Sequence, residues 1–379
     1  MSATVQTIII KSVSFCNLAC TYCSAHCGEH IRQQVRPESV LTVFNELLEA
    51  GRIAPACKVL WHGGEPSLYD PQKADFIMSE LALLGKKRCV KFDFSMQTNG
   101  FSISPAWMRL IRKYRIGIGI SCDGPEAVHD LCRKTATETG SYKNVMETIQ
   151  TFSKMKIPVS LLSVIDRRQA GHADSFYQWA AAQNRPIKLN PLFSENMGHA
   201  DLEGYFDFLC SFLRYYFQGD ADFSVEPLNG MILSVLNDSP AHECAFSGNC
   251  GKHILCINYS DKLSACGRIT DRNEFVYPII SGKIIEIVDV IQEQANRALH
   301  ARISRMQCTS CRYFKMCHAG CSAYLDQNSI RFYCESIRKF WGFMNGEALI
   351  LLKERLLKER KALLPLLDRD RKRERQITT

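Results

Sequence analysis

Three cysteines near the start of the chain have a spacing that suits metal chemistry. Cys16, Cys20 and Cys23 form a C-x3-C-x2-C pattern directly after an apolar, β-branched segment over 7–15. Three thiolates on one tight loop can hold three irons of a 4Fe–4S cubane, which leaves the fourth iron for a non-protein ligand. This spacing suits zinc poorly, because a structural zinc site takes four protein ligands. Three buried free thiols are the plain alternative.

Polar motifs end the next three strand-like segments. His62-Gly63-Gly64-Glu65-Pro66 follows one of them, Gln97-Thr98-Asn99-Gly100 closes the next, and Ser121-Cys122-Asp123-Gly124-Pro125 closes the third, with Arg133 soon after. The paired glycines permit close backbone approach, and Glu65 can accept hydrogen bonds from an ammonium group. Each motif alone could be an ordinary turn. Their recurrence predicts a site at one rim of a sheet.

Most of the remaining cysteines lie in a second, loop-rich half of the chain. Eight are spaced as C-x5-C-x15-C and C-x2-C-x5-C-x3-C-x12-C, namely Cys244, Cys250, Cys266, Cys308, Cys311, Cys317, Cys321 and Cys334. Eight thiolates are the number that two fully ligated 4Fe–4S clusters need. Zinc is the alternative for the second group. The seven others read as buried thiols: Cys27, Cys57, Cys89, Cys122, Cys132, Cys210 and Cys256.

The segments that must position these groups alternate between strand and helix. Strand-like stretches are 7–15, 58–62, 90–98, 117–122, 159–165 and 187–193, and helix-like stretches are 37–50, 71–84, 105–113, 141–155, 174–183 and 201–217. Six β/α repeats predict an α/β fold with a parallel sheet. A partial (β/α)6 TIM-like barrel is favoured, and a doubly wound open sheet competes with it. We expect a barrel over 1–220, a cysteine-rich domain over 221–345 and a basic helical tail over 346–379.

Composition narrows the class of protein. Of the 379 residues, 46% are hydrophobic and 23% charged, which is typical of a globular protein. No apolar run is long enough to span a membrane, and the N-terminus lacks a signal-peptide pattern. We therefore expect a cytoplasmic protein with no membrane partner, whose 18 cysteines are reduced and available as ligands. The segment 353–375 carries +5 of the net charge of +8. The excess of basic residues is therefore confined mostly to one terminal segment, which disfavours a nucleic-acid partner.

The run Cys16-Asn17-Leu18-Ala19-Cys20-Thr21-Tyr22-Cys23 resembles the signature loop of radical S-adenosylmethionine (SAM) enzymes. The resemblance implies that SAM chelates the open iron and yields a 5′-deoxyadenosyl radical. It also implies that Gly64 and Glu65 bind the SAM amino group and that Ser121 and Arg133 bind its carboxylate. Tyr22 and Leu192 would pack against the adenosyl group.

The second half resembles the SPASM extension of radical SAM enzymes. The family pattern gives one auxiliary 4Fe–4S cluster to Cys244, Cys250, Cys266 and Cys321. It gives the other to Cys308, Cys311, Cys317 and Cys334. The cofactors implied are three 4Fe–4S clusters and SAM.

SPASM-type enzymes mostly act on peptides or proteins, and the first half is similar to anaerobic sulfatase-maturating enzymes. Those enzymes use an Asp immediately after the third auxiliary cysteine, whereas Cys266 is followed by Gly267, and Asp271 is out of register. Glycine cannot accept a proton. We therefore expect a maturase that crosslinks a ribosomally made precursor peptide, through a C–C cyclophane-type or thioether bond. Formylglycine formation and RNA modification are the alternatives, and no catalytic residue is assigned.

The partners follow from this function. We expect the precursor peptide, an external electron donor such as flavodoxin or ferredoxin, and leader recognition by a separate protein, a sheet edge or the basic tail. The chain begins at the first strand, so no N-terminal peptide-recognition domain is expected.

Overall fold

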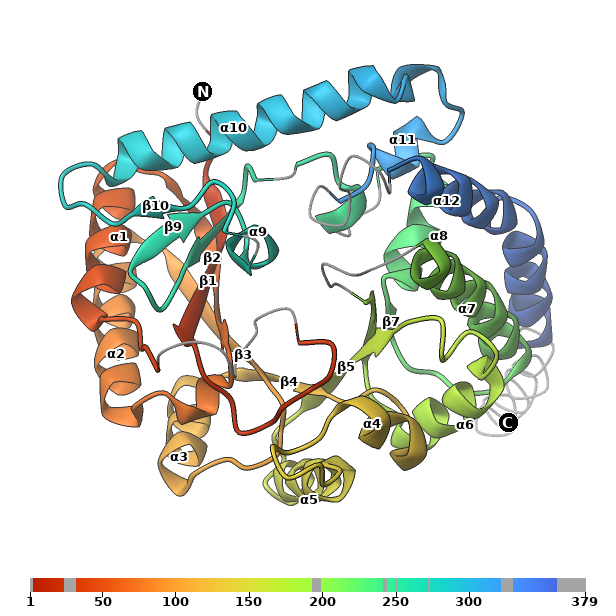
Figure 1. Cartoon of the computed structure of the whole chain (residues 1–379), viewed down its shortest axis with the longest axis horizontal. Helices are drawn as coiled ribbons and strands as arrows, with labels where there is room; N and C mark the ends of the chain where they lie inside the picture. Colours follow the sequence, from red (N-terminus) through yellow and green to blue (C-terminus); the bar gives the residue numbers. More distant parts are fainter. Residues whose placement is uncertain are drawn as a thin grey trace, which may run out of the picture.

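The computed structural model describes residues 3–23, 32–192, 199–240, 244–249, 251–271, 273–321 and 330–359. Its centre is one curved sheet of ten strands in the order β10-β9-β8-β1-β2-β3-β4-β5-β6-β7 (Figure 1). The first seven strands are β1 (Val5–Val13), β2 (Ile53–Gly63), β3 (Lys91–Thr98), β4 (Gly117–Ser121), β5 (Val159–Ile165), β6 (Ile187–Pro191) and β7 (Val225–Glu226). All six neighbouring pairs from β1 to β7 are parallel. The predicted partial barrel is confirmed.

Helices follow the strands and pack on the outside of the curved sheet (Figure 1). They are α1 (Pro37–Glu49), α2 (Pro71–Arg88), α3 (Pro105–Tyr114), α4 (Glu126–Cys132), α5 (Tyr142–Lys154), α6 (Ala173–Gln183) and α7 (His199–Gln218). Proline in the first turn starts α1, α2 and α3, where its missing N–H costs nothing. Asp70 and Ser104 cap α2 and α3 through their side chains. The six predicted helices are confirmed within a few residues, and α4 is an additional short helix.

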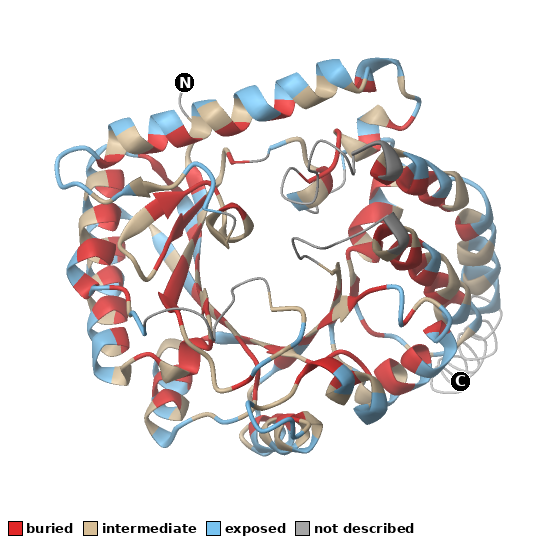
Figure 2. Cartoon of the chain, viewed as in Figure 1, coloured by how far each residue is buried: buried red, intermediate tan, exposed pale blue. Residues whose placement is uncertain are grey.

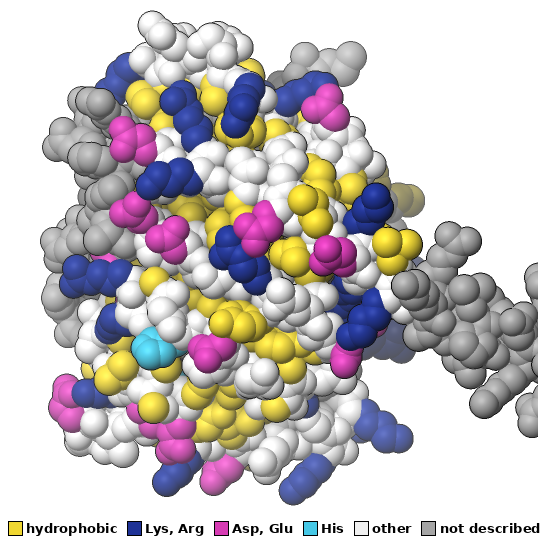
Figure 3. All heavy atoms as spheres, turned by 90° about the vertical axis from the view of Figure 1, so that its right-hand side faces the viewer, with side chains coloured by type: hydrophobic (Ala, Val, Ile, Leu, Met, Phe, Trp, Pro, Cys, Tyr) yellow, Lys and Arg dark blue, Asp and Glu magenta, His cyan; other side chains and the backbone are white. Residues whose placement is uncertain are grey.

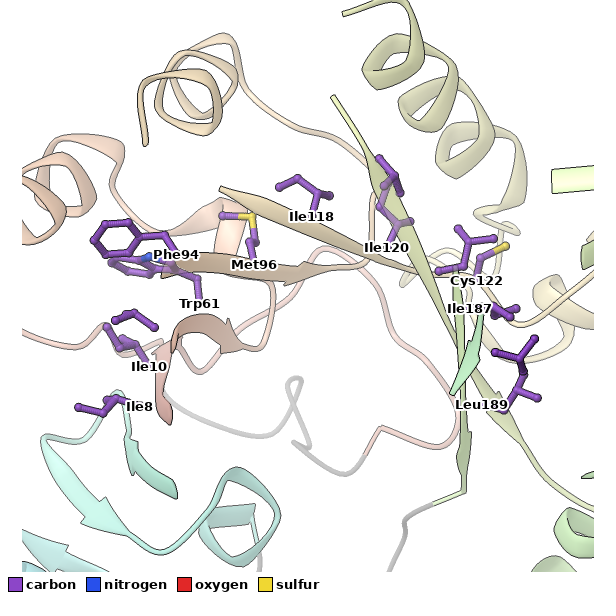
Figure 4. Close-up of a cluster of buried hydrophobic side chains, with 14 of the residues drawn as sticks. Ile8, Ile10, Trp61, Phe94, Met96, Ile118, Ile120, Cys122, Ile187 and Leu189 are labelled. Atoms are coloured by element: carbon purple, nitrogen blue, oxygen red, sulfur yellow. The ribbon is translucent and has the colours of Figure 1, made fainter. Parts of the chain in front are cut away.

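Side chains alternate between the two faces of each strand, which divides the core from the site. Ile8, Ile10, Trp61 and Met96 are buried among the side chains that face the outer helices (Figures 2 and 4). Trp61 packs edge-on against Trp107 of α3, with 5.9 Å between ring centroids. The opposite, concave face therefore carries the alternate residues, among them the polar Lys11, His62, Gln97 and Ser121.

The second half of the chain extends the same sheet. β8 (Ile254–Ile257) runs parallel to β1, with Ile10 opposite Ile257, and β9 (Lys262–Ser264) and β10 (Tyr277–Pro278) add antiparallel strands. The helices of this half are α8 (Leu228–Asn237), α9 (Gly267–Asp271), α10 (Ile284–Arg305), α11 (Phe314–Cys317) and α12 (Ile330–Met344). Strands from both sides of residue 220 thus share one sheet, and the domain limits at 220 and 345 stay predictions.

A further helix covers 347–359, where the predicted helical tail begins. None of the helices in the described part of the chain is both long and apolar enough to cross a membrane.

Candidate active site

The cysteine loop after β1 is held by backbone hydrogen bonds to the segment that follows α4. Ala19 N–H donates to Lys134 O over 2.7 Å, and Thr21 N–H donates to Cys132 O over 3.0 Å. Cys23 N–H closes a turn onto Cys20 O over 3.1 Å. The three predicted ligands, Cys16, Cys20 and Cys23, are half-buried on this loop at the carboxyl end of β1. The chain therefore places them at the rim where a parallel sheet binds its ligands.

The thiols of this loop are in surroundings that suit a metal-bound thiolate better than a free one. Burial raises the pKa of Cys16 to about 12, although donors from Leu18 N–H and Asn99 oppose the rise. The Asn99 amide nitrogen lies 3.3 Å from the Cys16 sulfur. Burial also raises the pKa of Cys20 to about 11, against the opposing charge of Arg133. Metal ligation deprotonates a thiol outright, so iron would bring these groups to the charged state that the donors favour.

Gly64 packs directly under the cysteine loop. Its N–H donates to Val13 O over 2.8 Å, and the following Glu65 N–H donates to Phe15 O over 2.9 Å. A Cβ atom at Gly64 would lie 2.1 Å from Phe15 O, so no larger residue fits without moving the backbone. The close approach expected of this glycine is thus made to the loop that carries Cys16.

Glu65 is fully buried and links three segments of the rim. Its Oε1 accepts from Thr98 Oγ1 at 2.7 Å and from Ser67 N–H at 3.0 Å, and its Oε2 accepts from Asn99 N–H at 2.7 Å. Burial raises the pKa of Glu65, and these donors oppose the rise. A carboxylate has about four acceptor positions, so Oε2 retains one for a further donor. Glu65 braces β2 against β3 and can still receive an ammonium group.

Arg133, Asp123 and Tyr22 form a buried polar group beside Cys20. Arg133 makes a bidentate pair with Asp123, through Nε at 2.9 Å and Nη2 at 3.2 Å, with side chains 8% and 2% exposed. Tyr22 donates its hydroxyl to the same carboxylate, and Val164 N–H donates to it over 3.0 Å. Burial alone would lower the pKa of Arg133, but the charge of Asp123 raises it well above its usual value.

Asp123 is a residue whose role the sequence did not reveal, although it stands inside the Ser-Cys-Asp-Gly-Pro motif. The motif was the available signal. Arg133 uses two of its five N–H donors on this carboxylate, so Asp123 orients the guanidinium and leaves donors for a second anion.

The last two residues predicted to contact SAM lie on the same rim. Ser121 ends β4, and its hydroxyl accepts from Gln97 Nε2 at 3.0 Å. Leu192 is half-buried just after β6, and its N–H donates to Ile165 O over 2.9 Å. The structure therefore brings Tyr22, Gly64, Glu65, Ser121, Arg133 and Leu192 to the carboxyl ends of the strands. Their contacts with SAM stay predictions.

One predicted auxiliary set surrounds a single cavity. Cys308, Cys311, Cys317 and Cys334 line a space of about 470 Å³, including its open mouth, between the end of α10, α11 and α12. Burial, and then the charges of the three neighbouring thiols, raise the pKa of Cys317 to about 12. These four side chains come together although 26 residues separate the first from the last.

Within the described ranges, no three His, Cys, Asp or Glu side chains converge as ligands of one metal ion would. Ligation of a 4Fe–4S cluster by Cys308, Cys311, Cys317 and Cys334 stays a prediction.

The other auxiliary set is only partly visible. Cys250 lies outside the described residues. Cys244 is exposed in a short 3-10 helix, Cys266 is half-buried just before α9, and Cys321 is buried. A guanidinium nitrogen of Arg268 lies 4.0 Å from the Cys321 sulfur. This contact connects α9 to the segment that follows α11. Ligation of a cluster by Cys244, Cys250, Cys266 and Cys321 stays a prediction.

A second cavity opens between β6 and α9. It has about 440 Å³, including open solvent, and its walls include Lys188, Asn190, Arg268, Phe206 and Tyr333. It therefore lies between the rim that carries the SAM residues and the segment that carries Cys266. A side chain of a substrate could reach both from this position.

Comparison with known families agrees with this geometry. Residues 10–172 match the model of the radical SAM superfamily, and this range spans the cysteine loop and the three polar motifs. The chain carries a radical SAM domain. The resemblance seen in the sequence is confirmed over this range, and radical SAM domains are enzyme domains that use a 4Fe–4S cluster and SAM.

The radical SAM chain also has relatives over nearly its whole length. It is 23% identical over 378 residues to a cysteine-type anaerobic sulfatase-maturating enzyme of Clostridium perfringens, covering 89% of this chain and 95% of that one. It is 25% identical over 351 residues to a serine-type anaerobic sulfatase-maturating enzyme of Klebsiella aerogenes, covering 88% and 84%. Both of these relatives are sulfatase-maturating enzymes.

Two solved structures share the fold. The structure of anSMEcpe with bound AdoMet aligns with a TM-score of 0.76 at 19% identity, covering 93% of this chain and 99% of that one. Streptococcus suis SuiB bound to S-adenosylmethionine aligns with a TM-score of 0.58 at 13% identity, covering 85% and 74%.

Proposed function

We propose that this radical SAM enzyme is a peptide maturase that forms an intramolecular crosslink in a ribosomally made precursor. The observation that carries the proposal lies in α9. Its first residue, Gly267, occupies the position after Cys266, and its last residue, Asp271, is paired with Lys11 of β1. A glycine cannot serve as the proton acceptor that formylglycine formation needs at that position. The relatives and their bound peptides support a peptide substrate, because solved structures include anSMEcpe with a Cp18Cys peptide and SuiB with the precursor peptide SuiA.

The SAM-binding roles are assigned by charge. SAM is a zwitterion at its methionine end, so it needs one anionic and one cationic partner. Glu65 offers the free acceptor position of its Oε2 to the ammonium group. Arg133 offers its remaining N–H donors to the carboxylate, and Asp123 fixes the plane of the guanidinium. Ser121, Tyr22 and Leu192 complete the wall. When SAM and the cluster are bound, they supply the 5′-deoxyadenosyl radical, and the chain supplies position and shielding.

Two auxiliary clusters are proposed as electron acceptors. Closing a ring removes a hydrogen atom from carbon, a proton from the partner group and one electron. The hydrogen atom goes to the deoxyadenosyl radical, the electron to an auxiliary cluster, and the proton to a base. The product is about 2 Da lighter than the precursor, with one deoxyadenosine per ring. Full ligation by four cysteines supports this role, because no iron is then left for the peptide.

Formylglycine formation is the second candidate, and the length of the match to the sulfatase-maturating relatives favours it. RNA modification has less support. Figure 3 shows basic and acidic side chains interspersed on the face at the right of Figure 1. Ion pairs also neutralise several basic side chains: Arg214 pairs with Glu347, and Lys315 pairs with Asp238. A phosphate-binding surface would gather basic groups alone.

The test compares products from two peptides. The anaerobically reconstituted enzyme is incubated with SAM, a reductant, and either a Cys-containing sulfatase peptide or the short peptides encoded beside its gene. The proposal expects a neighbouring peptide to become about 2 Da lighter, with the new bond stable to reduction and alkylation. Formylglycine in the sulfatase peptide, with every neighbouring peptide unchanged, would favour the second candidate. The same reaction with and without ferredoxin, flavodoxin or a separate leader-binding protein identifies the partners.

A further inference from the structure

The cavity lined by the second cysteine set contains an arginine with an unused donor. Arg302, in the last turn of α10, lines the cavity together with Cys308, Cys311, Cys317 and Cys334. Figure 1 shows this end of α10 beside the segment that leads to α11. The position brings a permanent positive charge to the wall of a space surrounded by thiols.

One N–H donor of the Arg302 guanidinium group has an acceptor, and a second, buried donor has none among the described residues. Its Nη2 donates to Gly320 O over 2.9 Å, which fixes the side chain. Its Nε–H is buried and has no hydrogen-bond partner among the described residues. A buried donor without an acceptor is unfavourable, so such a group usually marks an acceptor that occupies the site in the working protein.

A second arginine lines the same cavity in different surroundings. Arg338 lies one helical turn after Cys334 on α12, and its side chain is exposed. Both guanidinium groups therefore bring positive charge to the cavity that the four thiols line. Water screens Arg338 but not the buried face of Arg302. The pair therefore provides a natural comparison of a buried cation with an exposed one.

We propose that the Arg302 Nε–H donates a hydrogen bond to a sulfur of the cluster held by Cys308, Cys311, Cys317 and Cys334, and so raises the reduction potential of that cluster. The inference rests on the proposed function, which assigns the cluster to these cysteines. An added electron makes a cluster more negative, so a donor and a positive charge at its sulfurs stabilise the reduced state. This selects the cluster beside α10 as the acceptor of the electron released on ring closure. Arg302 is a positioning residue, since it acts through the cluster.

The test measures reduction potential directly. The background is the chain with Cys16, Cys20 and Cys23 changed to Ala, which leaves only the auxiliary clusters. In it, Arg302→Gln, Arg302→Lys and Arg338→Gln are compared by iron and sulfide analysis and by redox titration followed by electron paramagnetic resonance. We expect the iron content to be unchanged in all three variants. The reduction potential of one cluster should fall most in Arg302→Gln and less in Arg302→Lys, which keeps the charge but loses Nε–H. It should fall least in Arg338→Gln. An equal potential in Arg302→Gln and its parent, at full iron content, would overturn the proposal.

A second measurement detects the hydrogen bond spectroscopically. Exchange into D2O should shift the iron–sulfur stretching bands in the resonance Raman spectrum of the parent, because an N–H···S bond couples to them. The shift should be lost in Arg302→Lys. Arg302→Gln could lose iron while Arg302→Lys keeps the D2O shift. That result would show that Arg302 acts only through its bond to Gly320 O, and it would reject the proposed hydrogen bond from Nε–H to sulfur. If the parent binds no iron at these cysteines, the cluster assignment itself fails, which is a separate result.

Discussion

Lys11 of β1 and Asp271 at the end of α9 form an ion pair on the concave face of the sheet, 260 positions apart in sequence. The lysine side chain is 2% exposed and the aspartate 12%. The pair fixes α9, and with it Cys266 and Arg268, against the strand that carries the first cysteine loop. This ion pair therefore joins the pairing of β1 with β8 in holding the two cysteine-bearing segments together.

Breaking this pair should destabilise the whole chain. Lys11→Met removes the buried cationic partner of Asp271, and breaking such a pair from one side costs about 3–5 kcal/mol. Chemical denaturation of the reconstituted protein measures this loss. Lys11→Met combined with Asp271→Leu should recover most of it, since both charges are then removed. A single variant as stable as the parent would show that the pair adds nothing.

The pH dependence of this loss has a definite sign. Burial alone would lower the pKa of Lys11, but Asp271 raises it, and the net pKa lies above the ordinary value of 10.5. The folded chain therefore holds this proton more tightly than the unfolded chain. The contribution is complete at neutral pH and is lost as the pH rises through the folded-state pKa. The difference between the parent and Lys11→Met should be constant from about pH 6 to about pH 9, below the ordinary lysine pKa of 10.5, and shrink only in more alkaline solution.

Gly267→Asp should place a second carboxylate near Lys11. A Cβ atom at this position would lie 3.3 Å from Lys11 Cε, the flexible end of a side chain that can adjust. An Asp in the first turn also suits the helix dipole. In an Asp271→Asn background, Gly267→Asp should restore about 1 kcal/mol of the lost stability, and Gly267→Asn should not. Equal stability of the two Gly267 variants would contradict this geometry.

Iron content should report three clusters. Eleven cysteine ligands predict about twelve irons in the reconstituted protein, and the triple change of Cys16, Cys20 and Cys23 to Ala should leave about eight and abolish SAM cleavage. Colorimetric iron and sulfide assays, with deoxyadenosine measured by chromatography, provide the numbers. Only four irons in the parent would remove both auxiliary clusters from the assignment.

Substitutions at Glu65 and Arg133 should affect two properties at once. Glu65→Ala and Arg133→Ala each remove a charged partner of SAM, so SAM affinity should fall by about 1.5–3 kcal/mol. Each also leaves buried groups unsatisfied: three donors around Glu65, and the Asp123 carboxylate beside Arg133. Calorimetric titration with SAM and thermal unfolding separate the two effects, with the exposed Arg112→Ala on α3 as control. SAM affinity equal to that of the parent in both variants would refute the roles.

The sequence predicted the parts of this fold whose signal is local. Strand and helix periods, with prolines such as Pro71 and Pro105 at helix starts, placed the six β/α units within a few residues. The resemblance to the SPASM pattern grouped Cys308, Cys311, Cys317 and Cys334, and the structure places these four side chains around one cavity. These features depend on neighbours along the chain.

The contacts that escaped prediction are those between distant segments. Neither periodicity nor spacing pairs β8 with β1, aligns Asp123 with Arg133, or directs Thr98 and Asn99 to Glu65. Such pairs are decided by how whole elements pack, and a single sequence records no partner for a buried charge. The pairing of Lys11 with Asp271 is the clearest example, since each residue alone reads as an ordinary surface charge.

The parallel pairing of β8 with β1 has a consequence for biosynthesis. β1 leaves the ribosome well before β8, so one of its two edges lacks its β8 partner until Ile254–Ile257 has been made. A nascent chain that has completed only the first 217 residues carries the Cys16 loop on a strand with an open edge, which is prone to pairing with other chains. Pairings over such long sequence separations also form slowly. Assembly of the first iron–sulfur centre and completion of the C-terminal half are thus coupled steps of one folding process.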